Sequence, residues 1–431
     1  MLESFFADVH NRAMLMGVVC NASCALVGCL LVLRRMSLMG DALSHAILPG
    51  LVVALLVSGD GGPVALLAGA LGAGLVTTLL TGVAQRQAGV AADASLGVVY
   101  TTLFALGVVL VKQGLTQVHF DVACVYEGSL LQVALRTQTI AGARVPEALL
   151  VAGPVLLILV SLFVLLWKEW KLTSFDPALA GTMGFAPGAM HYLLMLLVSL
   201  TVMTSFEAVG SILVVAMLIG PAATAHLLTD RLAPMMVLSV IISTATTITG
   251  YQAAVALDVS PAGMIAVTTG VAYAAAALLG PRYGILVRLA QHARLALRVR
   301  REDLLAKLYR RREAEVAIPL PARQAAEEVG GGWLGRRAVS QLLRRGEAEV
   351  VAGALTLTET GAAEGRRLVR SHRLWETYLV EELGLPTDHV HEPAHRIEHF
   401  LDPDISQAIE SELATQPGAE PRDPHGREIP K

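Results

Sequence analysis

Two groups of polar residues in this chain have the types and spacing that suit a metal ion. The first lies in residues 40–50, where Asp41 and His45 are four residues apart in a mostly apolar stretch. On a helix they share one face, with Ser44 beside them. A carboxylate and an imidazole together suit a divalent transition metal. Ionisable side chains are expensive at membrane depth and mark ion pathways there, so we predict a site on a transport path.

The second group lies near the end of the chain and consists of histidines and glutamates. Its members are His372, Glu376, His391, His395, Glu398 and His399. Spacings of three and four residues place side chains on one helix face. Nitrogen and oxygen ligands without thiolate suit Mn, Fe, Co, Ni or Zn, and the affinity order alone does not choose among them. The alternative is the solvated face of a histidine-rich helix, and spacing leaves both interpretations open.

The composition divides the chain into two parts. Residues 1–281 contain 10 of the 33 Lys and Arg and 13 of the 36 Asp and Glu, whereas the last 150 residues hold 23 of each. The hydrophobic content of 54% and the mean hydropathy of +0.58 fit a membrane part joined to a charged, soluble part. We therefore predict a transmembrane domain at 1–281, a basic helical linker at 282–301, a winged-helix-like domain at 302–365 and a last helical domain at 366–431.

The first part contains apolar runs long enough to cross a bilayer as helices. There are about nine such runs. They lie near 13–33, 41–58, 63–83, 95–112, 148–167, 189–206, 208–228, 234–254 and 261–280. Residues 113–146 fit an outer loop with an amphipathic part. The positive-inside rule places the N-terminus outside and the C-terminal part in the cytosol, because basic residues then fall on one side. They are Arg34, Arg35, Arg86, Lys168, Lys171, Arg231, Arg282 and Arg288.

Glycine and proline interrupt several of these runs. The interruptions are Pro49-Gly50, Gly220-Pro221 and Pro261-Ala262-Gly263. Broken helices recur in transporters, where irregular backbone lines a cavity. Close helix packing is the alternative, since small residues let membrane helices approach one another.

Four ordered motifs in this part resemble the permease subunits of zinc, manganese and iron ABC importers. They are residues 40–50 (GDALSHAILPG), 93–97 (DASLG), 174–177 (SFDP) and 209–225 (VGSILVVAMLIGPAATA). The resemblance implies a multi-pass protein of the bacterial cytoplasmic membrane. It also implies a dimer with a second permease subunit, the same chain or a paralogue, that receives metal from an extracytoplasmic binding protein. The sequence has no GxxxxGK[ST] phosphate loop, so a separate ABC ATPase must supply energy and this chain is not an enzyme.

Further polar residues of the first part are candidates for roles in transport. Glu207 lies between two apolar runs and could line the path beside Asp41, Ser44 and His45, or lie at the outer surface. The short connection Thr229-Asp230-Arg231 joins two predicted spans on the cytosolic side. In an ABC permease such a segment can press on the ATPase, so we expect coupling there. A plain turn between helices is the alternative.

The soluble part begins with a helical pattern and continues with the order helix, turn, helix and hairpin. Two short helices are expected around Gly330-Gly331-Gly332 and a hairpin near 350–357, which is a winged-helix pattern. The second helix carries four arginines that could contact DNA phosphates or anionic lipid. They are Arg336, Arg337, Arg344 and Arg345. From Thr415 onward, abundant Pro and charge predict a mobile tail.

Residues 302–431 resemble the metal-sensing and dimerisation domain of the diphtheria-toxin-repressor type of iron- and manganese-dependent regulators. The resemblance rests on residues 372–376 (HRLWE), 390–399 (VHEPAHRIEH) and 424–430 (PHGREIP). It implies one metal site with His372, Glu376 and His391, and another with Glu398 and His399. Asp303 falls where manganese-type members place a ligand. His395 departs from the pattern, because a Cys or Glu is usual there.

The sequence therefore predicts an all-α polytopic membrane protein with a cytosolic winged-helix and helical metal-sensing domain. Its predicted function is that of an ABC importer permease for Mn, Zn or Fe, regulated by a metal that is both substrate and regulatory ligand. One alternative is a membrane-anchored, metal-dependent transcriptional regulator that binds DNA. Another is a permease whose tail only clamps a dimer.

Overall fold

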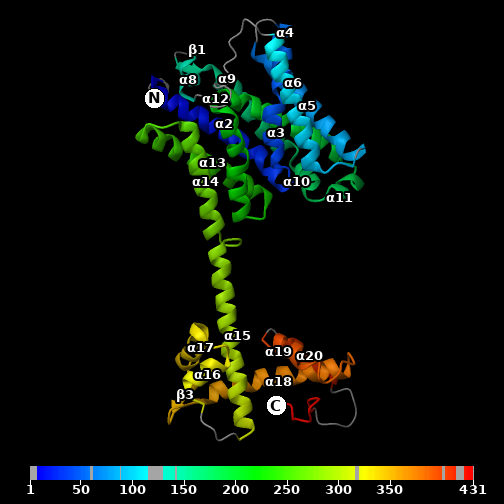
Figure 1. Cartoon of the computed structure of the whole chain (residues 1–431), viewed down its shortest axis with the longest axis vertical. Helices are drawn as coiled ribbons and strands as arrows, with labels where there is room; N and C mark the ends of the chain where they lie inside the picture. Colours follow the sequence, from blue (N-terminus) through cyan, green and yellow to red (C-terminus); the bar gives the residue numbers. More distant parts are fainter. Residues whose placement is uncertain are drawn as a thin grey trace. The chain divides into compact units, whose positions relative to one another are not determined.

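The computed structural model describes residues 7–58, 62–87, 89–114, 130–140, 143–315, 320–399, 403–413 and 422–430. The chain divides into two compact units, Met1–Val287 and Arg288–Lys431, which are described separately (Figure 1). The first unit contains the helices α2 (Val9–Leu33), α3 (Leu38–Ala46), α4 (Leu48–Ser58), α5 (Pro63–Gln87), α6 (Ala92–Gly114), α8 (Leu130–Leu135), α9 (Glu147–Leu165), α10 (Trp167–Phe175), α11 (Pro177–Thr182), α12 (Pro187–Leu228), α13 (Leu232–Leu257) and α14 (Pro261–Leu279).

The predicted membrane architecture is confirmed. Within the described ranges, eight helical segments are long and apolar enough to cross a bilayer, and the shorter apolar helix Leu213–Leu228 follows one of them. The consecutive helices α3 and α4 together make one of the eight segments. Their junction at Ile47 comes two residues before Pro49, as expected where proline cannot donate a backbone hydrogen bond.

One predicted helix break is wrong in its position. The sequence suggested Gly220-Pro221, yet α12 continues through Pro221. The break lies at Gly210, whose φ of 75° and ψ of 166° are not helical. Glycine tolerates this conformation because it has no Cβ. Pro261, by contrast, is the first residue of α14, where proline is well accommodated.

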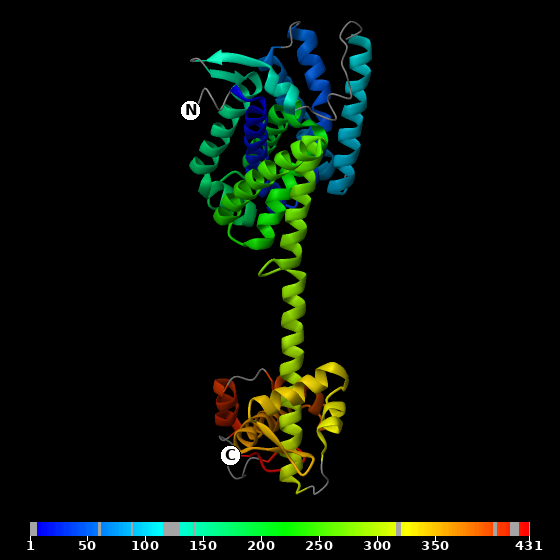
Figure 2. The ribbon, with the colours of Figure 1, turned by 90° about the vertical axis from the view of Figure 1, so that its left-hand side faces the viewer.

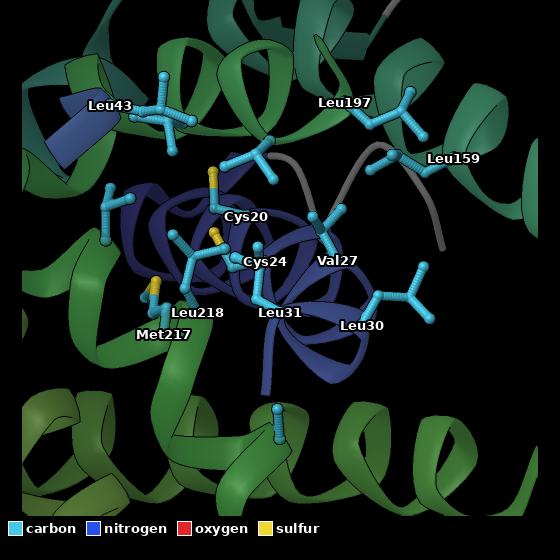
Figure 3. Close-up of a cluster of buried hydrophobic side chains, with 14 of the residues drawn as sticks. Cys20, Cys24, Val27, Leu30, Leu31, Leu43, Leu159, Leu197, Met217 and Leu218 are labelled. Atoms are coloured by element: carbon cyan, nitrogen blue, oxygen red, sulfur yellow. The ribbon is translucent and has the colours of Figure 1, made fainter. Parts of the chain in front are cut away.

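Helix α2 forms the centre of the first unit and packs mainly on α12 and α13. Of its most apolar window, 72% is buried, against 17% for the peripheral α14. Figure 3 shows Cys20, Cys24 and Leu31 of α2 close to Met217 and Leu218 of α12. The cysteines of α2 are buried and free, as predicted for small apolar residues. Cys124 lies outside the described residues.

The region between α6 and α9 contains structure that the sequence did not predict. After α8, the strands β1 (Thr137–Ile140) and β2 (Ala143–Pro146) pair antiparallel as a hairpin. Residues 115–129 lie outside the described part of the chain, so the predicted outer loop is described only at its end.

The second unit contains the predicted order of winged-helix elements. Its elements are α15 (Ile285–Glu313, which begins in the first unit), α16 (Ala322–Glu328), α17 (Gly332–Arg344), β3 (Ala348–Val351), β4 (Ala354–Leu357), α18 (Glu359–Glu381), α19 (His391–Ile397) and α20 (Pro403–Leu413). Leu304, Leu305 and Leu308 of α15 pack against apolar residues of α16, α17 and the β3–β4 hairpin. These elements surround the end of α15 in Figure 2.

Helix α18 begins at Glu359 and crosses position 365/366, where the winged-helix-like domain was predicted to end and the last helical domain to begin. Thr358 is its N-cap, and the Thr358 hydroxyl oxygen accepts a hydrogen bond from the Gly361 amide at 3.2 Å, which satisfies one of the free amides of the first turn. The helix lies close to α15 at Gly365, which has no side chain. A Cβ added there would be 2.9 Å from the Tyr309 Cβ.

The predicted mobile tail is wrong for residues 422–430. Ile429 is buried, and Arg370 and Arg373 donate hydrogen bonds to the carbonyl oxygens of Pro430 and Glu428. Buried cationic donors therefore hold this stretch against α18. The remaining residues of the tail, 415–421 and 431, lie outside the described part of the chain.

The packing of α2 on α12 makes a test of this fold. Gly28→Ala would place a Cβ 1.8 Å from the Leu218 carbonyl oxygen. Because the obstacle is backbone, the helices must shift, and we expect a loss of about 1–3 kcal/mol in thermal unfolding of the detergent-purified protein. Gly153→Ala is the control, since its Cβ would meet no described heavy atom within 4 Å. Equal melting temperatures for the two variants would contradict this packing.

Candidate metal centres

Four of the predicted ligands converge in the second unit and form what we name the first cluster. Asp303 comes from α15, His395 from α19, and Glu398 and His399 from the residues directly after α19. One ligand atom of each lies within 4.8 Å of the others. His399 Nε2 is 3.0 Å from Asp303 Oδ1, and His395 Nδ1 is 2.9 Å from Glu398 Oε1. Residues far apart in the sequence thus present nitrogen and oxygen atoms to one point.

The other three predicted ligands form the second cluster. His372 and Glu376 lie one turn apart on α18, and His391 begins α19. Glu376 Oε1 is 3.1 Å from His372 Nε2 and 2.9 Å from His391 Nδ1. His372 Nε2 is also 3.1 Å from His391 Nδ1. Two imidazoles therefore share one carboxylate oxygen.

His372 and Glu398 join the two clusters. His372 Nδ1 lies 2.7 Å from Glu398 Oε2, and the two side chains are 3% and 1% exposed. Since His372 Nε2 belongs to the second cluster, opposite edges of one imidazole ring face the two clusters. His395 and His391 are half or more exposed, so each cluster also has an open side.

The buried polar atoms of the clusters fit a metal ion. Four ligand atoms have no hydrogen-bond partner among the described residues, although burial of such atoms is costly. They are Asp303 Oδ1, His372 Nδ1, Glu398 Oε2 and His399 Nε2. They face one another in two close imidazole–carboxylate pairs, His372 with Glu398 and His399 with Asp303, without a hydrogen bond between the paired atoms. This donor set suits a divalent transition metal.

Glu302 is a functional residue that the sequence analysis missed. It is almost fully buried, and its Oε2 lies 3.0 Å from His399 Nδ1. Arg298 donates to Glu302 Oε1 at 2.8 Å. Glu302 therefore orients the His399 ring so that Nε2 faces Asp303, as outer carboxylates do for metal-binding histidines. A signal was present, because Glu302 and Asp303 are the only acidic residues between Arg288 and Arg312.

The clusters shift the pKa values of their members. Burial raises the pKa of Glu376 and of Glu398, but contacts with histidines outweigh it and hold each pKa at about 2. Burial lowers the pKa of His399, but the carboxylates of Asp303 and Glu302 outweigh it and raise the pKa to about 9. The pKa of His372 is also raised, by Glu376 and Glu398 against burial. Without metal, His399 is thus held protonated at neutral pH beside ionised carboxylates.

Asp41 and His45 lie on one face of α3 in the first unit. His45 Nε2 is 3.6 Å from Asp41 Oδ1, and the side chains are 27% and 43% exposed, respectively. Tyr100 and Phe104 of α6 lie against the His45 ring, with centroid distances of 6.2 and 5.6 Å. Ser44 is buried and donates to the Asp41 carbonyl oxygen at 2.6 Å. The structure thus leaves Asp41 and His45, rather than Ser44, accessible to an ion.

The remaining candidates lie on helix ends and exposed faces. Glu207 is on α12, and its side chain lies outside the described part of the structure. Thr229 is the C-cap of α12, and Arg231 is the N-cap of α13, so Asp230 lies in a very short connection. Four arginines are exposed on or directly after α17, where Arg337 stacks over Trp333 at 5.0 Å. They are Arg336, Arg337, Arg344 and Arg345.

Comparison with known proteins identifies the membrane unit. Residues 7–280 match the model of the ABC 3 transport family. The chain belongs to this family. Residues 358–431 match the iron dependent repressor, metal binding and dimerisation domain, so this permease carries a repressor-like domain that contains six of the seven clustered residues, all except Asp303.

Three similar proteins illustrate the relationship. The manganese transport system membrane protein MntD of Bacillus subtilis is 41% identical over 273 residues, which cover 63% of this chain and 92% of that protein. The zinc transport system membrane protein TroD of Treponema pallidum is 36% identical over 356 residues, which cover 82% and 96%. PsaBC from Streptococcus pneumoniae, solved with a Fab, matches with a TM-score of 0.55 and 28% identity over 63% of this permease and 92% of that chain.

The TroD alignment is longer than the whole first unit, which ends at Val287. It must therefore extend into the second unit. TroD therefore also matches part of the second unit.

The charged clusters predict how the stability of the metal-free second unit depends on pH. The lowered pKa values of Glu376 and Glu398 add stability above pH 4.5 that is lost as the pH falls toward about 2. The raised pKa of His399 adds stability below pH 6.5 that is lost as the pH rises through about 9. We expect fragment 288–431 to unfold at the highest temperature between these limits. Thermal circular dichroism with a chelator present measures this profile.

Glu398→Gln is the informative variant for the acid limb, because it removes the ionisable group but keeps its size. Its melting temperature should vary less with pH below 4.5 than that of the parent. A profile without loss at either end would contradict the arrangement of charges described above.

Proposed function

We propose that this permease is the membrane subunit of an ATP-binding-cassette importer for a divalent transition metal, and that its second unit binds the same metal as a regulatory ligand. The observation that carries the proposal is the pair of clusters, in which seven nitrogen and oxygen ligands converge and four buried ligand atoms have no hydrogen bond within the described part of the chain. A permease needs no such centre for transport alone. Its presence on a chain of the ABC 3 transport family favours regulation by the transported ion.

Asp41 and His45 are the residues that we propose for the transport path. A carboxylate and an imidazole bind a divalent metal, and a two-fold dimer would supply a second pair. Two ligands from each subunit would hold the ion weakly enough to release it, which conduction requires. Tyr100 and Phe104 limit the orientations open to His45. Ser44 and Glu207 remain secondary candidates in this path.

The partners follow from what this chain lacks. A separate ABC ATPase supplies ATP hydrolysis, because the sequence has no phosphate loop. We propose that the loop Thr229-Asp230-Arg231 contacts that ATPase. An extracytoplasmic binding protein delivers the metal, and a second permease subunit completes the path. This arrangement requires the N-terminus outside and the second unit in the cytosol of a bacterial cell.

Manganese and zinc are the metals that we favour. The relatives MntD and TroD are named for their transport, and the donor set of the clusters contains only nitrogen and oxygen. His395 occupies a position where the related regulators place Cys or Glu, so this permease would have its own order of preference. Regulation requires that the metal bind one state of the importer more tightly than the other.

Metal binding by the second unit is tested by calorimetric titration of Mn²⁺, Fe²⁺ and Zn²⁺ into fragment 288–431. We expect saturable binding that Glu398→Gln weakens by at least the roughly 10–100-fold typical of outer-sphere changes, because Glu398 contacts both clusters. Glu392→Gln is the matched control, since Glu392 is exposed and pairs only with exposed Arg396 in the described structure. Absence of binding, or equal binding by both variants, would remove the sensor function.

Transport is tested separately in vesicles that contain the full chain with its ATPase. Asp41→Asn and His45→Asn should each abolish most ATP-dependent ⁵⁴Mn uptake, because each removes a ligand of the ion without a change in size large enough to disturb α3. Asp258→Asn is the control, since Asp258 is an exposed C-cap of α13. Uptake that survives both substitutions at Asp41 and His45 would place the path elsewhere.

A further inference from the structure

Asp230 connects the loop between α12 and α13 to a distant part of the same unit. The Tyr283 hydroxyl donates a hydrogen bond to Asp230 Oδ1 at 2.9 Å. The Arg282 guanidinium forms an ion pair with Asp230 Oδ2. The hydrogen bond from Tyr283 lowers the pKa of Asp230 and keeps it ionised. The loop is therefore held by two neighbouring side chains, about fifty residues away along the chain.

Both partners of Asp230 lie outside the domain that defines the family. The match to the ABC 3 transport family ends at residue 280, and α14 ends at Leu279. Arg282 and Tyr283 occupy the turn that follows, and α15 begins at Ile285. The loop is thus held by residues that follow the matched family range and come directly before α15, within the first unit.

The turn that carries both partners is tight. A Cβ on Gly284 would lie 2.3 Å from the Gly280 carbonyl oxygen, and one on Gly280 would lie 2.4 Å from the Ala276 carbonyl oxygen. The Gly284 amide donates a hydrogen bond to the Gly280 carbonyl oxygen at 2.9 Å. Arg282 and Tyr283 thus lie between two positions that require glycine, directly before the start of α15.

Helix α15 also supplies residues of the metal centre. It is continuous from Ile285 to Glu313 and carries Asp303, together with Glu302, which holds His399. One element thus begins beside the contact with Asp230 and contains a ligand of the first cluster.

The contact of Asp230 with Arg282 contributes little to folding stability. Arg282 and Asp230 are both about half exposed, and exposed ion pairs add little to folding stability. Such a contact can break and form again at small cost, which suits a two-state element rather than a permanent brace.

We propose that the contact of Asp230 with Arg282 and Tyr283 is the output of the metal-sensing unit. Metal binding at the first cluster shifts α15, and this contact passes the shift to the loop that faces the ATPase. The inference rests on the proposed function and names the route by which that regulation acts. The route links Asp230, within the matched family range, to residues that follow that range.

The test measures hydrogen–deuterium exchange of the loop in the full chain in lipid nanodiscs. Peptides that span 225–232 are followed with and without Mn²⁺. We expect Mn²⁺ to change their exchange by about five-fold or more, the lower range of allosteric couplings. The change should vanish in Arg282→Gln/Tyr283→Phe and in Glu398→Gln. Tyr273→Phe, which removes the hydroxyl of another exposed tyrosine, should respond like the parent.

The Glu398→Gln variant distinguishes an effect of Mn²⁺ bound to the second unit from an effect of Mn²⁺ in the transport path, because Asp41 and His45 are unchanged in this variant. Unchanged exchange in a parent chain whose tail binds Mn²⁺ would overturn the proposal, as would a full response in Arg282→Gln/Tyr283→Phe. Failure of the proposed function is recognised separately, as absence of Mn²⁺ binding by fragment 288–431 or of ⁵⁴Mn uptake by the parent.

Discussion

The buried carboxylate of Glu398 is the group on which the second unit depends most. A carboxylate that is 1% exposed must be compensated by positive charge or by a metal ion. His372, His395 and the more distant Arg310 surround it, and they come from three different helices. The positions of α15, α18 and α19 are thus tied to one charge. The close approach of α18 to α15 at Gly365 permits this convergence.

The cost of burying a charge also shapes the membrane unit. Ionisable side chains are expensive in the hydrocarbon core of a bilayer, so they are confined to few positions in the spans. Asp41 and His45 are partly exposed on α3, and the His45 ring lies against two aromatic rings of α6. Small residues decide how closely the helices approach, as Gly28 does between α2 and α12. A rigid frame around a few polar groups is what selective passage requires.

The chain joins a transport domain to a domain related to metal-dependent repressors. If the second unit senses metal as proposed, each permease carries its own sensor, since both domains lie on one polypeptide. Thermodynamic linkage makes the effect mutual: if metal at the clusters changes the state of the loop, a partner bound to the loop must change the affinity of the clusters. His372, which faces both clusters, makes their occupancy interdependent.

The sequence by itself determined the division into two parts, the membrane spans and six of the seven clustered ligands, while the family resemblance added Asp303. The spans and the six ligands depend on hydropathy and on helical period, which act over a few residues. Only the tertiary structure decided that Asp303 and His395 share a cluster, that Glu302 orients His399, that α12 breaks at Gly210 and that Arg282 holds Asp230. Such contacts depend on packing between elements distant in the chain, which no local pattern specifies.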